Sequence, residues 1–284
     1  MSGPLGHKVF VTEQLPQSGR DPLPDGSTRM WSPITSTLIM ASRDAVLVDP
    51  PLTVDQAGAV GDWIAASGRE LRGIYITHGH GDHWFGAIPL LERFPGVAIR
   101  ATAGTAKLMA AQNDPEFRKE FWDRVFPGQL PVGELDPTVV DDRGFDLEGI
   151  ALMPVEVGHT DTDATTMLHV PDMNLLVAGD VVYNGVHLYL TESGGTDGID
   201  EWLAALDTAE ALRAARVVAG HKDPRAFDNP SQIQATRRYL RDARRLLESS
   251  ESAQEFYLEM LRLHPDRLNA GALWGAAITL FPSA

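Results

Sequence analysis

The chain has 284 residues, of which 43% are hydrophobic, with a formal net charge of −15 and no cysteine. This composition is typical of a globular protein with a substantial core, and the lack of cysteine excludes disulfides, thiolate nucleophiles and Cys-based zinc sites. The negative charge argues against nucleic acid as a partner, because a polyanion would meet a repulsive surface.

The predicted elements alternate between strands and helices along the chain. β-Rich runs predict strands at 33–48 (a hairpin that turns at 42–44), 71–77, 97–101, 150–157, 164–170, 175–178 and 217–219. Helical patterns predict helices at 54–66, 85–94 and 203–214, and three more after residue 230. This alternation indicates a layered α/β protein. We expect residues 1–284 to form one domain, on which residues 230–284 pack as a helical extension.

No membrane segment is expected from the sequence. Residues 1–14 have neither the basic region nor the apolar run of a signal peptide. The apolar segment 270–281 is too short to span a bilayer and contains Gly271 and Gly275, so a packed helix is expected there. We therefore expect a cytoplasmic protein that acts on a small molecule, without membrane or nucleic-acid partners. Assembly into a homo-oligomer is left open.

An aromatic stripe at helical spacing marks the segment 114–131. Its members are Phe117, Phe121, Trp122, Val125 and Phe126. Such a stripe either packs on the core or forms a lid or pocket wall for an apolar substrate, and the sequence leaves both open.

Residues 74–84 read IYITHGHGDHW and place three histidines and one aspartate directly after a predicted strand. His78 and His80 are two residues apart, a spacing that along an extended backbone places both rings on the same side. Asp82 and His83 follow the turn and can face a second point close by. Neutral imidazole and carboxylate are the ligands that borderline divalent metals prefer, so this run predicts a metal site.

Three later pairs share one pattern, in which a glycine ends a strand-like run and a histidine or aspartate follows. The pairs are Gly158-His159, Gly179-Asp180 and Gly220-His221. Because strand ends converge at the sites of α/β sheets, we expect these side chains to complete the early run. The predicted ligands are His78, His80 and His159 for one ion and Asp82, His83 and His221 for a second, with Asp180 bridging them.

These motifs, in this order, resemble those of the metallo-β-lactamase superfamily. The matching stretches are AVLVDP, THGHGDHW, VGHTDT, AGD and AGH, within residues 33 to 225. The resemblance implies a four-layer αβ/βα sandwich with metals at one edge, and it makes Asp49 a supporting aspartate. The sequence departs from the family where Asp161, Thr162 and Asp163 replace a frequent Pro-Gly. Local hydrogen bonds that support the loop are expected from these residues, with a role in disfavouring anionic substrates as the alternative.

The resemblance implies a hydrolase with two zinc ions per chain that share a hydroxide. Asp82 and Asp180 would hold the ions, and the hydroxide would attack a small ester, lactone or thioester. Lactone-hydrolysing members place a tyrosine near the position of Tyr183. Its hydroxyl is therefore expected to donate to the developing oxyanion, with packing under the loop as the alternative.

Other functions remain open on the same motifs. A mononuclear iron dioxygenase or another oxidoreductase of this fold is the main alternative, because such enzymes keep the full motif. A phosphodiesterase is less expected. A β-lactamase is also less expected, since the true β-lactamases generally lack an aspartate at the position of Asp180.

Overall fold

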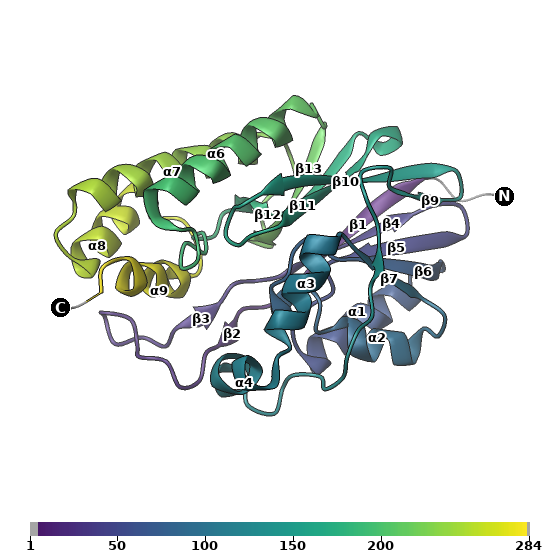
Figure 1. The fold of residues 1–284 in the computed structure, drawn as a ribbon, viewed down its shortest axis with the longest axis horizontal. Coiled ribbons are helices and arrows are strands. Elements are labelled where there is room, and N and C mark those ends of the chain that lie inside the picture. The colour runs from purple at the N-terminus through teal and green to yellow at the C-terminus, as the bar shows by residue number, and fades with distance from the viewer. Residues whose placement is uncertain (1–4, 283–284) are drawn as a thin grey trace.

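Two sheets pack face to face in the computed structural model, which describes residues 5–282 (Figure 1). The first sheet has the strand order β1-β4-β5-β6-β7-β8 and the second the order β13-β12-β11-β10-β9. Strands β2 and β3 form a separate two-stranded ribbon. Strands β5, β6, β7 and β8 pair in parallel, as do β12 and β13, and the remaining pairs are antiparallel.

The strands are β1 (Gly6–Val11), β2 (Leu15–Pro16), β3 (Met30–Trp31), β4 (Thr35–Met40), β5 (Asp44–Val48), β6 (Glu70–Tyr75), β7 (Ala98–Ala101), β8 (Thr138–Val139), β9 (Phe145–Leu147), β10 (Ile150–Gly158), β11 (Thr165–Val170), β12 (Leu175–Asn184) and β13 (Arg216–Lys222). The α-helices are α1 (Val54–Ala65), α2 (Ala87–Arg93), α3 (Ala103–Gln112), α4 (Pro115–Phe117), α5 (Asp123–Val125), α6 (Gly195–Ala211), α7 (Ser231–Ser249), α8 (Ala253–Leu263) and α9 (Ala270–Leu280). Short 3₁₀-helices occupy Gly81–His83 and Pro171–Met173, and a π-helix occupies Arg118–Trp122.

Three apolar clusters hold the layers together. One lies between the two sheets and includes Val46 and Tyr75 from the first sheet and Leu168 and Val177 from the second. The other two lie on the outer faces, one beneath α1 and α2 and the other beneath α6 and α7. Figure 1 shows the resulting order of helices, sheet, sheet and helices. The predicted four-layer αβ/βα sandwich with a C-terminal helical extension is confirmed.

The C-terminal helices continue the outer layer of the second sheet. Helix α7 packs on α6 and β12, α8 packs between α7 and α9, and α9 reaches the ribbon strand β3. Buried Arg237 of α7 ties this layer together through ion pairs with Asp207 and Glu210 of α6, at 2.6 and 3.0 Å. The contact between α9 and β3 matters for function, because it forms one wall of the pocket described below.

Two strands run further than their sequence patterns predict. Strands β12 and β13 continue past Gly179 and Gly220, and their parallel pairing includes Tyr183 opposite His221. Register shifts on both sides of Gly179 allow this continuation. Asp180 and His221 therefore lie within paired strands and not after strand ends. The sequence patterns also missed β1, β2, β3, β8, β9 and α3, and they placed the start of α6 at residue 203 and not at Gly195.

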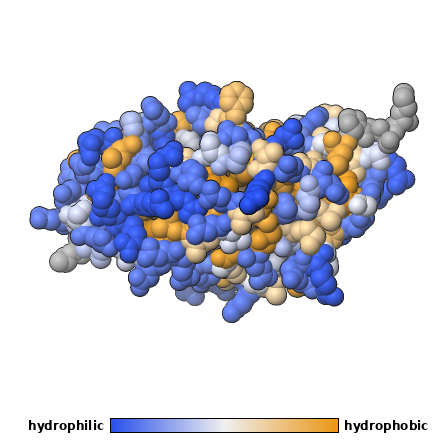
Figure 2. Space-filling view, turned by 90° about the horizontal axis from the view of Figure 1, so that it is seen from above, coloured by the Kyte–Doolittle hydropathy of each residue, from blue (hydrophilic) through white to orange (hydrophobic). Residues whose placement is uncertain are grey.

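One face of the molecule is mostly hydrophilic (Figure 2). Seen from above the view of Figure 1, polar side chains cover most of the face and hydrophobic ones form smaller patches (Figure 2). Among residues 5–282, no helix is long and apolar enough to cross a membrane.

Candidate metal centre

The early histidine run lies between β6 and α2, with the side chains turned inward. Strand β6 ends at Tyr75, and the 3₁₀-helix Gly81–His83 reverses the chain. The side chains of His78 and His83 are fully buried, with ring centroids 4.3 Å apart. Gly79 is required here for space and not for a special backbone angle, because a Cβ at this position would collide with Leu108 of α3.

One cluster joins the 3₁₀-helix to the second sheet. Ligand atoms of Asp82, His83 and His221 all lie within 4.8 Å of one another. Asp180 of β12 contacts both imidazoles, since Oδ1 lies 3.3 Å from His83 Nε2 and Oδ2 lies 3.3 Å from His221 Nε2. The structure thus brings together all three predicted ligands of the second ion and the predicted bridging residue.

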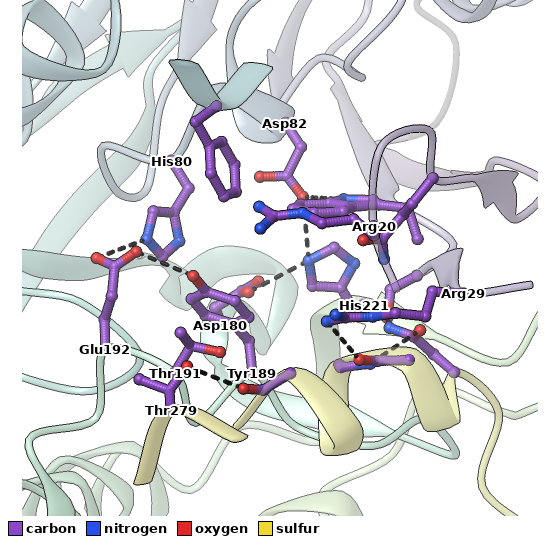
Figure 3. Close-up of a pocket in the computed structure, with 18 of the residues that line it drawn as sticks. Arg20, Arg29, His80, Asp82, Asp180, Tyr189, Thr191, Glu192, His221 and Thr279 are labelled. Carbon is purple, nitrogen blue, oxygen red and sulfur yellow. Dashed lines mark hydrogen bonds and ion pairs between the residues drawn. The ribbon is translucent and has the colours of Figure 1, made fainter. Parts of the chain in front are cut away.

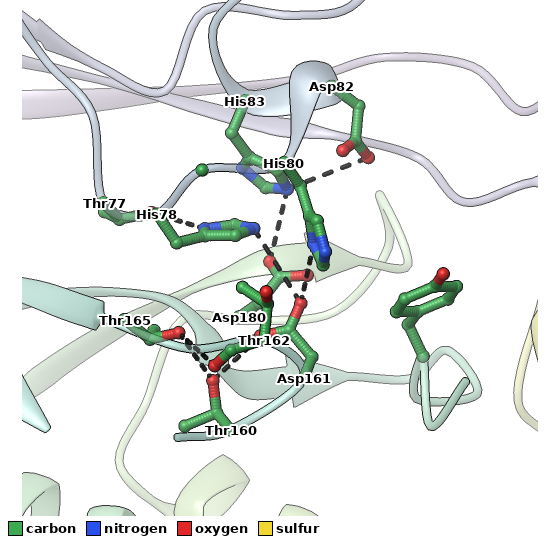
Figure 4. Close-up of polar contacts among 12 residues, drawn as sticks. Thr77, His78, His80, Asp82, His83, Thr160, Asp161, Thr162, Thr165 and Asp180 are labelled. Carbon is green, nitrogen blue, oxygen red and sulfur yellow. Dashed lines mark hydrogen bonds and ion pairs between the residues drawn. The ribbon is translucent and has the colours of Figure 1, made fainter. Parts of the chain in front are cut away.

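A second cluster contains His78, His80 and Asp161, whose ligand atoms also lie within 4.8 Å of one another. Asp161 Oδ2 lies 3.0 Å from His80 Nδ1 and 3.8 Å from His78 Nε2. Figure 4 shows the Asp161 carboxylate facing both rings from the loop after β10. This cluster contains two of the three residues predicted for the first ion, with Asp161 as its third member.

His159, the third predicted ligand, lies elsewhere. Its Nδ1 is 2.7 Å from the carboxylate of Asp163, and its Nε2 faces the start of α6 near Gly198. Positive φ at Gly158 turns the chain, and Thr160 Oγ1 then donates to Asp161 Oδ1 at 2.8 Å. The turn therefore directs His159 away from the centre and toward the start of α6, and it leaves the second oxygen of Asp161 facing the histidines.

A shell of hydrogen bonds orients the imidazoles. Asp49 accepts from the backbone N–H of Thr77 at 2.9 Å and from its hydroxyl at 2.7 Å, and Asp49 Oδ2 lies 3.3 Å from His83 Nδ1. Because the Thr77 hydroxyl donates its hydrogen bond to Asp49, its oxygen can only accept from His78 Nδ1, which lies 3.0 Å away. His78 Nε2 is therefore left with its lone pair facing the cluster.

The second sheet and the ribbon orient the remaining groups. His221 Nδ1 lies 2.8 Å from the carbonyl oxygen of Pro33, which can only accept, so this nitrogen carries the proton and Nε2 faces Asp180. Trp31 of β3 donates its indole N–H to Asp82 Oδ2 at 2.8 Å. Such outer partners fix the orientation of metal ligands and tune their basicity.

Tyr183 is buried at the base of the site. Its hydroxyl donates to Asp180 Oδ2 at 2.5 Å, and its ring stacks on His221 with centroids 5.5 Å apart. The hydroxyl proton is thus held by Asp180. The predicted donation to an oxyanion stays a prediction. The hydrogen bond that the structure contains positions Asp180.

The electrostatics favour a bound cation. Burial raises the pKa of Asp180, but His221 and His83 outweigh it and hold that pKa well below its usual range. Burial and then His83 lower the pKa of His78, which keeps its ring neutral as a metal ligand requires. Burial opposes protonation of His221, yet Asp180 and Asp82 raise its pKa well above the ordinary value, so a metal would displace a proton there.

Three buried polar atoms at the centre have no hydrogen-bond partner in the described structure: His78 Nε2, Asp161 Oδ2 and Asp180 Oδ1. Buried polar atoms are rarely left unpaired, because each costs about 1–3 kcal/mol. All three are nitrogen or oxygen atoms that can coordinate zinc or another divalent transition metal. The side chains present therefore fit a metal centre.

A pocket opens beside this centre, between the ribbon, the segment 114–131 and α9 (Figure 3). Metal-centre residues on its wall are His80, Asp82, Asp180 and His221, and Tyr183 also lines it. From the aromatic stripe, Phe117, Phe121 and Trp122 line the pocket, whereas Val125 and Phe126 are buried in the outer core of the first sheet. The stripe thus serves both as core and as pocket wall.

Sequence reasoning missed several groups around the site. Asp161 follows His159 by two residues in the turn after β10, and its position beside a predicted ligand was a signal that two ligand candidates compete there. Trp31, Arg20 and Arg29 come from the N-terminal segment, which carries no recognisable motif. Only tertiary packing brings these three side chains to the pocket.

Comparison with known proteins agrees with the geometry. A family model described as the metallo-beta-lactamase superfamily matches residues 29–221, which include every residue of both clusters. No curated protein compared with the chain matches it.

Several solved structures share the fold. The metallo-beta-lactamase family protein TTHA1429 from Thermus thermophilus is 20% identical, covers 95% of this chain and 92% of its own, and has a TM-score of 0.62. A metallo-beta-lactamase from Pontibacter korlensis is 19% identical over 84% of this chain and 99% of its own, with a TM-score of 0.58. The mono-zinc form of the metallo-beta-lactamase FIM-1 from Pseudomonas aeruginosa is 14% identical over 86% and 97%, with a TM-score of 0.56.

Proposed function

Because this chain belongs to the metallo-beta-lactamase superfamily, we propose that it is a zinc-dependent hydrolase with two ions per chain, acting on a small ester, lactone or thioester. The observation that carries the proposal is the pair of adjacent clusters, one of His78, His80 and Asp161 and the other of Asp82, His83 and His221. Each cluster offers three nitrogen or oxygen ligands, which is the number that a catalytic zinc site uses when it keeps one position open.

When bound, such metals supply Lewis acidity that lowers the pKa of water and polarises a carbonyl oxygen. The chain itself provides the orientation. Asp180 contacts His83 and His221 through different oxygens, and its buried Oδ1, which has no hydrogen-bond partner, would help to hold the ions between the two clusters. Trp31 holds Asp82 in place from the pocket side.

The pocket walls support a small apolar acyl substrate. Trp31, Phe121 and Trp122 present aromatic faces beside the polar centre, with the Trp31 and Trp122 ring centroids 5.5 Å apart. An apolar wall excludes water and strengthens the electrostatic interactions beside it. A small ester, lactone or thioester would fit between this wall and the metal ligands.

One observation favours a second candidate. Two histidines and one carboxylate, the composition of the His78, His80 and Asp161 cluster, also form the ligand set of non-haem iron oxygenases. A mononuclear iron dioxygenase is therefore the alternative function. The second complete cluster favours the dinuclear hydrolase, because a mononuclear enzyme would leave Asp82, His83 and His221 without a role.

Metal analysis combined with substrate screening tests the proposal. We expect natively purified protein to contain close to two equivalents of zinc, and hydrolysis of at least one ester, lactone or thioester to stop after chelation and return with zinc. One equivalent of iron, a visible absorption band and oxygen consumption with a thiol substrate would instead establish the oxidoreductase alternative.

A further inference from the structure

Two arginines stand on the pocket wall in a protein whose net charge is −15. Arg20 lies between β2 and β3, and Arg29 directly precedes β3. Figure 3 shows both on the same side of the pocket, across from Glu192, with His80, Asp82 and Asp180 nearby. The mechanism above uses neither of them.

Neither arginine has an acidic partner among residues 5–282. No ion pair joins Arg20 or Arg29 to a carboxylate, although the chain contains 39 acidic residues. Two acids on the pocket wall are engaged elsewhere, since Glu192 contacts His80 and Tyr189 at 3.4 and 3.0 Å, and Asp82 accepts from Trp31. Two guanidinium groups are therefore left to face the pocket without countercharge.

Arg29 is buried and Arg20 half-buried, and both are incompletely hydrogen-bonded. Arg29 is only 8% exposed and donates from Nη2 to the carbonyl of Gly271 at 3.1 Å, while its Nε has no partner. Arg20 lies with its guanidinium carbon 4.9 Å from the ring centroid of Phe121, and its Nε is likewise buried without a partner. Buried charge without countercharge is costly, and a bound anion would relieve that cost.

Helix α9 is shaped to accommodate one of these groups. A Cβ at Gly275 would collide with Nη2 of Arg29, so the glycine leaves room for the guanidinium beside the helix. Burial and then the nearby Arg20 lower the pKa of Arg29, and Asp21 opposes this from outside ion-pair distance. The two positive groups thus repel each other in the absence of an anion between or beside them.

We propose that Arg20 and Arg29 form a carboxylate-binding subsite, so that the substrate of the metal centre is an organic acid with a hydrophobic body and a free carboxylate. The inference rests on the proposed hydrolase function for the reacting bond, but the subsite itself stands on the arginines. Guanidinium groups recognise carboxylates through paired, charge-assisted hydrogen bonds. The aromatic wall of Trp31, Phe121 and Trp122 would hold the hydrophobic body between the arginines and the metal ligands.

Binding of matched probes to the metal-loaded protein tests the subsite without requiring turnover. The probes are 4-phenylbutyrate, its neutral amide 4-phenylbutyramide, and acetate, with affinities measured by calorimetry. We expect the wild type to bind the aryl carboxylate about tenfold more tightly than the amide, and acetate to bind more weakly than the aryl carboxylate. High salt should reduce the preference for the carboxylate.

Because bound metals also attract carboxylates, variants of the arginines are needed to show which of the two groups binds the probe. Arg20→Gln and Arg29→Gln should each lower the preference about tenfold at unchanged metal content, whereas Arg29→Lys should retain part of it. The charge-matched control is Arg143→Gln, because the Arg143 side chain is 87% exposed and, within residues 5–282, pairs only with Asp141. If Arg29→Gln does not fold, Arg20→Gln still carries the test, since Arg20 makes no hydrogen bond in the described structure.

The outcomes distinguish the two proposals. A preference for the carboxylate that persists unchanged in the folded glutamine variants would place the carboxylate at the metals and overturn the subsite. Equal affinity for acid and amide in the wild type would also overturn it. A preference that depends on the arginines, in a protein that hydrolyses no ester, lactone or thioester, would support the subsite and refute the hydrolase.

Discussion

The carboxylate of Asp161 lies 3.0 Å from Nδ1 of His80, in the cluster for which the sequence motif predicts His159 as the third ligand. His159 instead pairs with Asp163 at 2.7 Å. The loop after β10 thus offers two ligand candidates at a spacing of two residues. The turn at Gly158 and the hydrogen bond from Thr160 favour the aspartate.

The first prediction concerns this choice of ligand. Asp161→Asn should lower the affinity for one metal ion by more than the 10- to 100-fold that is typical when a residue hydrogen-bonded to a ligand is changed. His159→Gln should lower this affinity less. Metal titration by calorimetry measures both variants, with Asp163→Asn as the control for the surface pair. Loss of one equivalent from His159→Gln alone would mean that the loop rearranges when it binds metal and that the original motif assignment is right.

The second prediction concerns Asp49, which contacts both Thr77 and His83 behind the cluster. Asp49→Asn should weaken metal binding by about 10- to 100-fold, because an amide orients and polarises the imidazole less than a carboxylate does. Asparagine tolerates the positive φ of 53° at this position, so the backbone should remain intact. Asp62→Asn on the surface of α1 is the matched control, and equal metal affinity in both variants would contradict the supporting role.

The third prediction concerns Tyr183, whose hydroxyl donates to Asp180. Tyr183→Phe removes one buried hydrogen bond to a charged group, worth about 1.5–3 kcal/mol, and should lower metal affinity as well as activity. Tyr239→Phe, which also alters a buried tyrosine but lies away from the centre, should leave metal affinity unchanged. If Tyr183→Phe lowers kcat about tenfold while metal affinity and KM stay the same, the hydroxyl donates to the oxyanion and not to Asp180.

The fourth prediction concerns pH and the buried His187, whose Nδ1 lies 3.0 Å from the Tyr239 hydroxyl. Burial, and then Arg267 and His264, lower the pKa of His187 to about 3. The unfolded chain would bind a proton there below its ordinary pKa of about 6.5, while the folded chain would not. This contribution to stability is therefore complete above pH 6.5 and is lost at about 1.4 kcal/mol per pH unit as the pH falls toward 3.

Urea unfolding at pH 7 and pH 5 tests this effect of His187. The wild type should lose about 2 kcal/mol more than His187→Gln between these two conditions, because the variant has no titrating group at that position. Other groups that titrate over this range act in both proteins and cancel in the comparison. An identical pH dependence in the two proteins would show that His187 takes up its proton in the folded state.

Local sequence patterns were sufficient to predict the layered α/β organisation and the early histidine run of the metal centre. Strand and helix periodicities are local properties, so most elements were predicted to within a few residues. The run from His78 to His83 is local as well, because its two-residue spacing after a strand turns the side chains to one side before any other segment arrives. The pattern of a strand-like run that ends in glycine then predicted Asp180 and His221.

Long-range packing determines which groups meet in the centre and pocket. The choice between His159 and Asp161 depends on the turn between β10 and β11, where the hydroxyl of Thr105 in α3 donates to the carbonyl of Ala164. Asp180 and His221 lie within strands because β12 and β13 pair beyond their glycines, a long-range contact that local patterns do not encode. The pocket arginines come from a segment without periodicity or motif, and α9, which begins at Ala270, completes their surroundings from the far end of the chain.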